Sequence, residues 1–401
     1  MKPAKITIQG DFWDCQIYRG RLYLWQIDGS LRVVDWRQLV ESFIDLPEQM
    51  LAMSAAFLQG RLLYSAETHS LFMDPELRIL LMKKFDDLSD RMLVVTTDQV
   101  QYFTIGHYDN PFKELQTDTE ILNNSIFALT YDGFWNVKTH LNGRRKIGQK
   151  TTKINDYIGY SLKAGKYARL ALSCGDEGLY EYNAAKTYSN VFFDKDPCRI
   201  ISSRHSSFAD FNFLSLYNSS LLGNSFLSLF KLPAKVNYEE IFHEKYLDDE
   251  ISEEKIFGRN EENTLSWGSN EKIYQASGGI LRLTSFNNYE EDGSYFYGDK
   301  QYHFQNWKGK ILRGGAAYFG TIIECENSIV VLIGEDQFHN IPGSATRWRV
   351  YPRSINYENH LHVIQDDRLE IYSFNHDYFE DRQTQKIGII FNPNKPVFFK
   401  K

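Results

Sequence analysis

The sequence has 401 residues but no apolar run of the length, about 18 residues or more, that a membrane-spanning helix requires. Residues 1–10 include Lys2 and Lys5 but no apolar core of the kind found in signal peptides, so nothing in them predicts secretion. We therefore expect no membrane partner.

Cysteines are few, and they form no CxxC pair. The four are far apart in the chain: Cys15, Cys174, Cys198 and Cys325. Widely spaced cysteines of this kind favour reduced thiols in a cytoplasmic protein.

A basic surplus is also missing, because the net charge is −7. Proteins that bind nucleic acid or anionic membranes without specificity usually carry excess Lys and Arg to neutralise phosphates. The overall charge therefore argues against that class.

Motifs that carry chemistry are absent or incomplete. The sequence has no GxSxG elbow, no GxGxxG after a strand and no calcium loop. Gly143, Gly148, Lys150 and Thr151 approach the phosphate loop GxxxxGK[ST], but Gln149 separates the second glycine from the lysine and breaks the register. We assign no catalytic residue and expect no cofactor.

Two histidines raise the question of a metal site. His360 and His362 are two positions apart, which on a strand places both rings on one face. Two metal ligands could arise in this way, but no third ligand is evident, and a polar strand face is the simpler interpretation. No metal is expected.

Aromatic residues are abundant, at 15% of the chain, and they favour strands. A short apolar run, a turn of Asp, Gly, Asn or Ser and a second apolar run recur along the sequence, which is typical of β-hairpins. The first pair of strands is 22–25 and 31–36, joined by Asp28-Gly29-Ser30. Similar pairs are 126–129 with 134–137, 170–172 with 179–182, 273–276 with 280–283, and 361–364 with 369–372.

Weaker copies of the hairpin pattern lie at 62–72, 92–103, 213–230 and 329–339. The turns recur about every 42 residues, close to the period of propeller blades, and predict about seven blades, with eight as the alternative. Helix is expected only at 36–43 and at 238–247.

The hairpins resemble those of β-propeller proteins of the WD40 type, in a degenerate form. Trp13-Asp14 and Gly106-His107 match the dipeptides of that repeat, once each. The resemblance implies an all-β fold, with one propeller domain over residues 1–401. The strand Ile387–Phe391 would pair with the strand near Ile6–Ile8 to close the ring, or would form an ordinary edge strand. A pair of β-sandwich domains is the alternative fold.

Two charged segments interrupt the hairpins. The acidic insertion, residues 236–263, has ten acidic and three basic residues between Glu239 and Glu262, a local charge of −7. It is either a solvated loop or a docking element, whose apolar face would include Tyr238, Ile241, Phe242 and Tyr246.

The basic segment, Lys138–Lys153, has no carboxylate, and its candidate ligand-binding residues are Arg144, Arg145, Lys146 and Lys150. The alternatives are that it pairs with the acidic insertion or that it is a solvated loop.

The sequence therefore favours a non-enzymatic interaction module or scaffold whose partners are one or more proteins. Two alternatives remain open. One is a hydrolase or lyase that uses the central channel of the propeller. The other is recognition of a phosphorylated ligand or nucleic acid by the basic segment.

Overall fold

The computed structural model divides the chain into two compact units, Met1–Asp109 with Gly315–Lys401, and Asn110–Gly314. It describes residues 2–63, 68, 71, 74–139, 150–165, 169–175, 177–184, 205–210, 214–219, 230–231, 246–247, 257, 265–269, 272–277, 279–286, 296–303, 310–333 and 337–374. The single propeller domain with a closed ring, expected from the sequence, stays a prediction.

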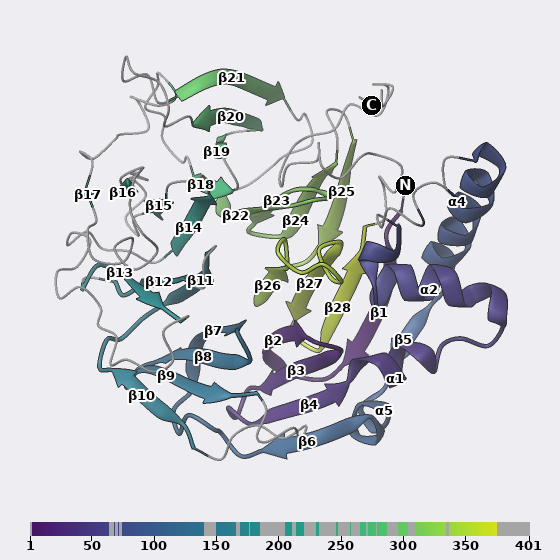
Figure 1. Cartoon of the computed structure of the whole chain (residues 1–401), viewed down its shortest axis with the longest axis horizontal. Coiled ribbons are helices and arrows are strands. Elements are labelled where there is room, and N and C mark those ends of the chain that lie inside the picture. The colour runs from purple at the N-terminus through teal and green to yellow at the C-terminus, as the bar shows by residue number, and fades with distance from the viewer. Residues whose placement is uncertain are drawn as a thin grey trace. The chain divides into compact units, whose positions relative to one another are not determined.

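Two sheets of the first unit are antiparallel and four-stranded, and most of their neighbouring strands follow one another in the chain (Figure 1). One sheet contains β2 (Phe12–Tyr18), β3 (Arg21–Gln26), β4 (Leu31–Asp35) and β6 (Thr104–Tyr108). A second contains β22 (Ile311–Ala317), β23 (Gly320–Cys325), β24 (Ser328–Ile333) and β25 (Gln337–Pro342), and the boundary between the units falls within β22.

The third sheet of this unit joins the two ends of the described chain. Its order is β26 (Arg347–Val350), β27 (His360–Gln365), β28 (Arg368–Ser373), β1 (Ala4–Gln9) and β5 (Leu93–Val95). Strand β1 pairs antiparallel with β28 along its whole length and parallel with β5 over Ile6–Ile8. Both edges of Ile6–Ile8 are therefore occupied, so the expected pairing with Ile387–Phe391 is wrong at this place. Ile387–Phe391 itself lies outside the described residues.

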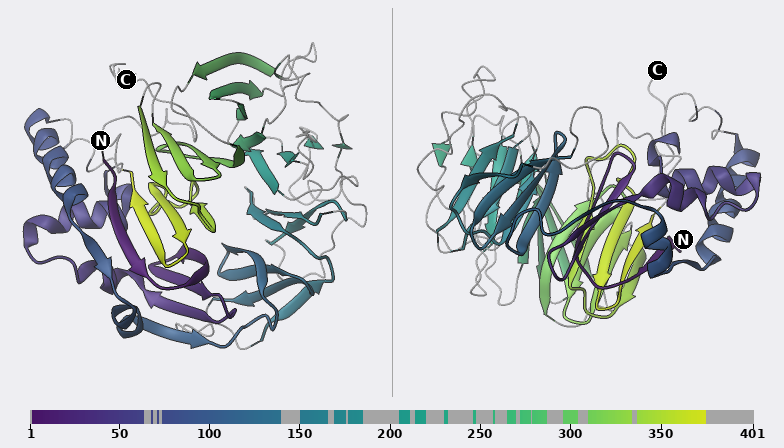
Figure 2. Two further views of the ribbon diagram at one scale, coloured as in Figure 1. Left: turned by 180° about the vertical axis from the view of Figure 1, so that it is seen from behind. Right: turned by 90° about the horizontal axis from the view of Figure 1, so that it is seen from below.

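A helical insertion, residues 36–103, separates β4 from β6, includes β5 and lies beside β1 (Figures 1 and 2). It contains α1 (Trp36–Glu41), η1 (Pro47–Gln49), α2 (Met50–Phe57), η2 (Gly60–Leu63), α4 (Pro75–Asp90) and α5 (Thr97–Tyr102). Helix α1 confirms the prediction at 36–43. None of the helices in the described ranges is long and apolar enough to cross a membrane.

Two expected hairpins are wrong because this insertion takes their place. Residues 62–63 belong to η2 rather than to a strand. Residues 92–103 contain β5, which pairs with β1, and α5, which begins at a capping box between Thr96 and Gln99. Capping satisfies backbone N–H groups that a hairpin would place in a ladder, so helix replaces the second strand here.

The second unit repeats the antiparallel pattern. A four-stranded sheet consists of β7 (Gln116–Leu122), β8 (Ser125–Thr130), β9 (Gly133–Lys138) and β10 (Thr152–Asn155). A three-stranded sheet follows, with β11 (Ser161–Ala164), β12 (Arg169–Ser173) and β13 (Leu179–Asn183). Next are two strand pairs, β14 (His205–Asp210) with β15 (Leu214–Ser219), and β16 (Phe230–Lys231) with β17 (Tyr246–Leu247). The last sheet has β18 (Leu265–Ser269), β19 (Lys272–Ser277), β20 (Ile280–Phe286) and β21 (Phe296–His303).

The five clear hairpins and the weaker one at 329–339 are confirmed. They are β3–β4, β8–β9, β12–β13, β19–β20, β27–β28 and β24–β25. The expected pair at 213–230 stays a prediction: β15 pairs with β14 and β16 pairs with β17, and residues 220–229 between them lie outside the described ranges. The helix expected at 238–247 is wrong at its end, where Tyr246–Leu247 is a strand, and its other residues lie outside the described ranges.

Apolar strand residues form the core of each unit, and central strands such as β8 and β27 are buried on both faces. In the first unit, Ile6, Ile8 and Ile371 pack with residues of the helical insertion. In the second unit, Phe127, Leu129 and Leu172 belong to one cluster. The described chain is thus mostly β, and its four-stranded antiparallel meanders have the strand order of propeller blades.

Candidate functional site: the helical insertion and its anchor

The start of helix α4 is determined by two local residues, Asp74 and Pro75. The Asp74 carboxylate accepts hydrogen bonds from the backbone N–H groups of Glu76, at 2.8 Å, and Leu77, at 3.3 Å, and Pro75 occupies the first turn. An acidic N-cap followed by proline is a strong helix start because both suit the unpaired N–H groups of the first turn. Leu81, Phe85 and Leu88 recur at helical spacing and are buried, so one face of α4 packs on the core.

The remaining faces of α4 expose an unusual number of apolar side chains. The exposed fractions are 40% for Leu77, 69% for Ile79, 51% for Leu80 and 40% for Met82. Of the 18 large apolar side chains that are exposed in the described residues, nine lie between positions 46 and 92: Leu46, Met50, Leu51, Leu71, Leu77, Ile79, Leu80, Met82 and Met92. Exposed apolar residues concentrated in one segment are typical of an interaction surface.

A buried hydrogen-bond cluster anchors the insertion to the sheet that contains β1. The Ala56 carbonyl, at the end of α2, accepts from His360 Nε2 at 2.8 Å, Asn359 Nδ2 at 3.1 Å and Ser373 Oγ at 2.8 Å. Carbonyl groups in the last turn of a helix have no partner within the helix, so side chains of the sheet satisfy this one. Trp36 Nε1 likewise donates to the Phe57 carbonyl at 2.7 Å.

Further bonds fix the outer parts of the insertion. Ser89 Oγ donates to the Lys2 carbonyl at 2.7 Å, which ties the end of α4 to the residues that precede β1. Lys84 Nζ donates to the Glu48 carbonyl at 3.0 Å, which ties the middle of α4 to η1. The exposed apolar side chains therefore stand on a base that is bonded at several points.

The two histidines of the anchor lie on one face of β27, as their spacing predicts, with ring centroids 5.6 Å apart. His360 Nε2 faces a carbonyl and must carry the proton, so His360 Nδ1 accepts from His362 Nε2 at 3.4 Å. His362 Nδ1 in turn accepts from the Tyr351 hydroxyl at 3.2 Å. This chain of bonds requires both rings to be neutral. Burial supports that state, because it lowers the pKa of His360 to about 4 and that of His362 well below its usual range.

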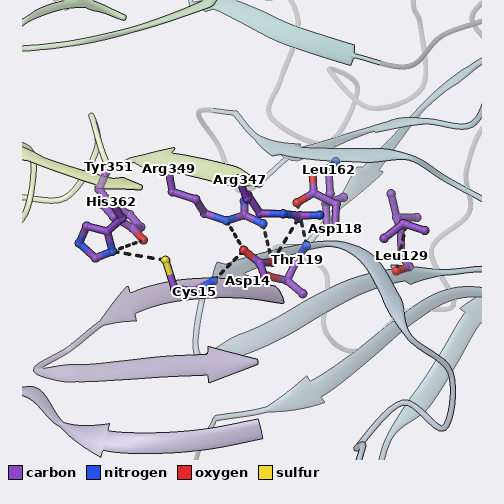
Figure 3. A network of polar contacts seen from close by, with 11 residues as sticks. Asp14, Cys15, Asp118, Thr119, Leu129, Leu162, Arg347, Arg349, Tyr351 and His362 are labelled. Carbon is purple, nitrogen blue, oxygen red and sulfur yellow. Dashed lines mark hydrogen bonds and ion pairs between the residues drawn. The ribbon is translucent and has the colours of Figure 1, made fainter. Parts of the chain in front are cut away.

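A buried ion pair lies next to this chain (Figure 3). The Arg349 guanidinium donates to both carboxylate oxygens of Asp14, at 2.7 and 2.6 Å, and Arg347 approaches the same carboxylate at 3.4 Å. The backbone N–H of Cys15 also donates to Asp14, at 2.8 Å. A bidentate pair of this geometry joins β2 to β26 and compensates the burial of both charges.

The second unit uses an aspartate in the same way. Asp14 in β2 and Asp118 in β7 both follow a register shift in the first strand of a sheet. Asp118 accepts from the N–H of Thr119 at 2.9 Å and from the N–H of Leu162, in β11, at 2.7 Å (Figure 3). The Asp of Trp13-Asp14 therefore positions neighbouring strands within its unit, and Gly106-His107 lies in β6 of the same sheet as Trp13-Asp14.

Cys15 and His362 resemble a nucleophile and its base, but their protonation states do not fit that role. The Cys15 sulfur lies 3.6 Å from His362 Nδ1, and both side chains are fully buried. Burial, followed by the nearby Asp14 carboxylate, raises the pKa of the Cys15 thiol, so no thiolate forms at neutral pH. Among the described residues, no group of three His, Cys, Asp or Glu side chains is placed to hold a metal ion.

Most of the candidate site residues from the charged segments lie outside the described ranges. These are Arg144, Arg145, Lys146, Tyr238, Ile241 and Phe242. Lys150 is described and exposed, and Tyr246 lies in β17. Lys153, at the end of the basic segment, pairs with Asp132 at 3.0 Å and Asp156 at 2.7 Å, so part of the charge of that segment is neutralised.

The exposed apolar residues of α4 were not among the candidates from the sequence. Residues 77–82, Leu-Arg-Ile-Leu-Leu-Met, read as a short apolar run without clear periodicity. The usable signal was Asp74-Pro75 followed by Leu77, Leu81, Phe85 and Leu88 at helical spacing.

No protein-family model matches the chain, and no curated protein is significantly similar to it. Solved structures that resemble it include the computationally designed Ika8 protein, at 8% identity, over 93% of this chain and 100% of that chain, with a TM-score of 0.42. YCF48 bound to D1 peptide has 9% identity, over 93% and 95%, with a TM-score of 0.44. Kluyveromyces lactis Hsv2 has 12% identity, over 65% and 75%, with a TM-score of 0.40. Such values identify neither a family nor a function.

Proposed function

We propose that this protein is a non-enzymatic interaction module built on a seven-bladed β-propeller, with the helical insertion as its docking element. The number of blades is supported by the sheets: the two strand pairs β14–β15 and β16–β17 follow each other in the chain and would form one blade. Strand β1 would complete the last blade beside β28 and close the ring.

The observation that carries the docking role is the concentration of exposed apolar side chains on an insertion that is firmly bonded to its sheet. Ile79 and Met82 are three positions apart on α4, so they form a ridge on the outward side of the helix. The partner best suited to such a ridge is a protein that presents an amphipathic helix, because helices pack ridge into groove.

The test compares partner capture by the wild-type chain and by the variant Ile79→Glu, Met82→Glu. A captured protein is identified, purified and titrated, and we expect its affinity for the variant to fall at least about tenfold, because charges replace desolvated anchors. The matched control is Asp86→Asn, Asp87→Asn, which changes exposed positions of the same helix without removing apolar area. Equal affinity for all three proteins would contradict the docking role of α4.

The two charged segments stay proposed contact surfaces of the same module. Replacement of Asp248, Asp249 and Glu250 by Asn or Gln leaves β17 in place. It is expected to leave thermal unfolding unchanged and to weaken capture if the acidic insertion contributes to docking. The cytoplasmic location is proposed as well, and its support is that Cys15, Cys174 and Cys325 are buried free thiols.

A further inference from the structure

A second flank of α4 carries a pattern that the outward ridge does not use. Leu77, Leu80 and Lys84 follow one another at steps of three and four residues, so they lie along one side of the helix, next to η1. Leu77 and Leu80 are exposed, and the exposed Glu76 stands one turn before Leu80. This flank therefore consists of two leucines with an acid at one end and a base at the other.

The order of charges on this flank selects its partner. In an antiparallel copy of α4 centred on Leu80, position 76 faces position 84, because each is four residues from the centre. Glu76 would then face Lys84 of the second copy at both ends. Leu80 would meet Leu80 of the second copy at the centre, and Leu77 would pack between Leu80 and Lys84 of that copy. A parallel copy would place Glu76 against Glu76 and Lys84 against Lys84, which is unfavourable.

We infer that two copies of this chain associate through antiparallel α4 helices, with Leu77 and Leu80 at the centre and Glu76–Lys84 pairs at the ends. The inference rests on the proposed function only in that the helical insertion is the interaction element. Lys84 remains able to form the pair because its ammonium group has three hydrogens and only one is directed at the Glu48 carbonyl.

The contact between two α4 helices is small. Helix α4 has 16 residues and is therefore about 24 Å long. A single pair of such helices buries less area than the roughly 1,200 Å² of standard interfaces. We expect a weak dimer, with a dissociation constant on the order of 10 to 100 μM.

The experiment is sedimentation velocity of the full chain over a concentration series that spans this range. The wild type is expected to shift from monomer to dimer. Leu80→Glu places two carboxylates at the two-fold axis and is expected to weaken association at least about tenfold. Ile79→Glu, on the outward ridge of the same helix, is the matched control and should still dimerise.

Charge reversal tests the antiparallel arrangement itself. Glu76→Lys alone and Lys84→Glu alone should each be monomeric. In a dimer of either variant, positions 76 and 84 of the two facing molecules would carry charges of the same sign. An equimolar mixture of the two variants should form a heterodimer, and the double variant Glu76→Lys, Lys84→Glu should recover the wild-type dimer.

The outcomes separate this inference from the proposed function. A wild type that stays monomeric throughout the series overturns the inference, as does a mixture of the two charge variants that fails to associate. If partner capture is then still lost in Ile79→Glu, Met82→Glu, the docking role of α4 stands without self-association. If the dimer forms and no capture depends on α4, the dimer remains and the docking proposal fails.

Discussion

His360 and His362 show how single residues hold the helical insertion to its sheet. The bonds from the Tyr351 hydroxyl through both rings to the Ala56 carbonyl exist only while the rings are neutral. A proton added to His362 Nδ1 would remove the acceptor for Tyr351 and place a charge beside Arg349. The anchor of the insertion is therefore sensitive to acid.

The first prediction concerns pH. The pKa of His360 falls from 6.5 to about 4 on folding, so the unfolded chain binds more protons between these values. Stability is complete above about pH 6.5 and decreases as the pH falls toward 4, by roughly 3 kcal/mol for this residue. Urea unfolding at several pH values measures the slope. His360→Gln should flatten it, and a variant with the same slope as the wild type would contradict this account.

The second prediction concerns the buried ion pair. Asp14→Ala leaves the Arg349 guanidinium buried without its carboxylate, and we expect a loss of about 3 to 5 kcal/mol in the free energy of unfolding. The variant Asp14→Leu, Arg349→Met removes both charges and should be more stable than Asp14→Ala. Asp90→Asn is the control, because the Lys2–Asp90 pair is exposed and should contribute less than about 1 kcal/mol. A small effect of Asp14→Ala in chemical denaturation would contradict this account.

At the scale of the element, the sequence predicted the hairpins well and the helical insertion poorly. The turn between β3 and β4 is a local feature: Gly29 has a φ of +83°, which glycine tolerates, and the Asp28 carboxylate accepts from the N–H of Ser30 at 2.9 Å. Such turns can be read from a few residues. Strand β5 could not be predicted as a partner of β1, because their pairing is parallel and more than eighty residues separate them.

The candidate site was harder to predict for the same reason. Whether Leu77 or Leu80 is buried depends on which side of α4 meets the sheet, and that is decided by contacts with β1 and α2. The apolar run at residues 77–82 is compatible with a buried strand as well as with a helix. Only the start of the helix, at Asp74-Pro75, was encoded locally.

The third prediction tests that local signal. Asp74→Ala removes the acceptor for two backbone N–H groups at the start of α4, and we expect a loss of about 1 kcal/mol. Thermal unfolding of the variant measures the effect. Asp86→Ala, in the middle of the same helix, is the control and should change stability by less than about 0.5 kcal/mol. Equal effects of the two substitutions would show that the cap contributes nothing.

At the scale of the whole molecule, the sheet that joins the ends of the described chain is the feature on which the first unit depends. Removal of β1 would leave one edge of β28 and one edge of β5 unpaired. It would also take Ile6 and Ile8 out of the core and expose the side chain of Ile371, which packs in the same cluster. No other strand in the described residues pairs with these edges.

The fourth prediction follows from this arrangement. Deletion of residues 1–9 should destabilise the unit Met1–Asp109 with Gly315–Lys401 as a whole, and not only the neighbouring strands. Hydrogen exchange is the measurement, and we expect protection to be lost in β28 and also in β26 and β27. Loss of protection restricted to β28 and β5 would contradict it.

The position of β1 has a consequence for synthesis of the protein. The strand leaves the ribosome well before its partner β28, which is made roughly 360 residues later; at about 5 to 20 residues per second this is a delay of roughly 20 to 70 s. Strand β5 emerges much earlier and can cover one edge of β1 in the meantime. The parallel pairing of β1 with β5 is therefore available to the nascent chain as temporary protection against aggregation, until the last sheet is complete.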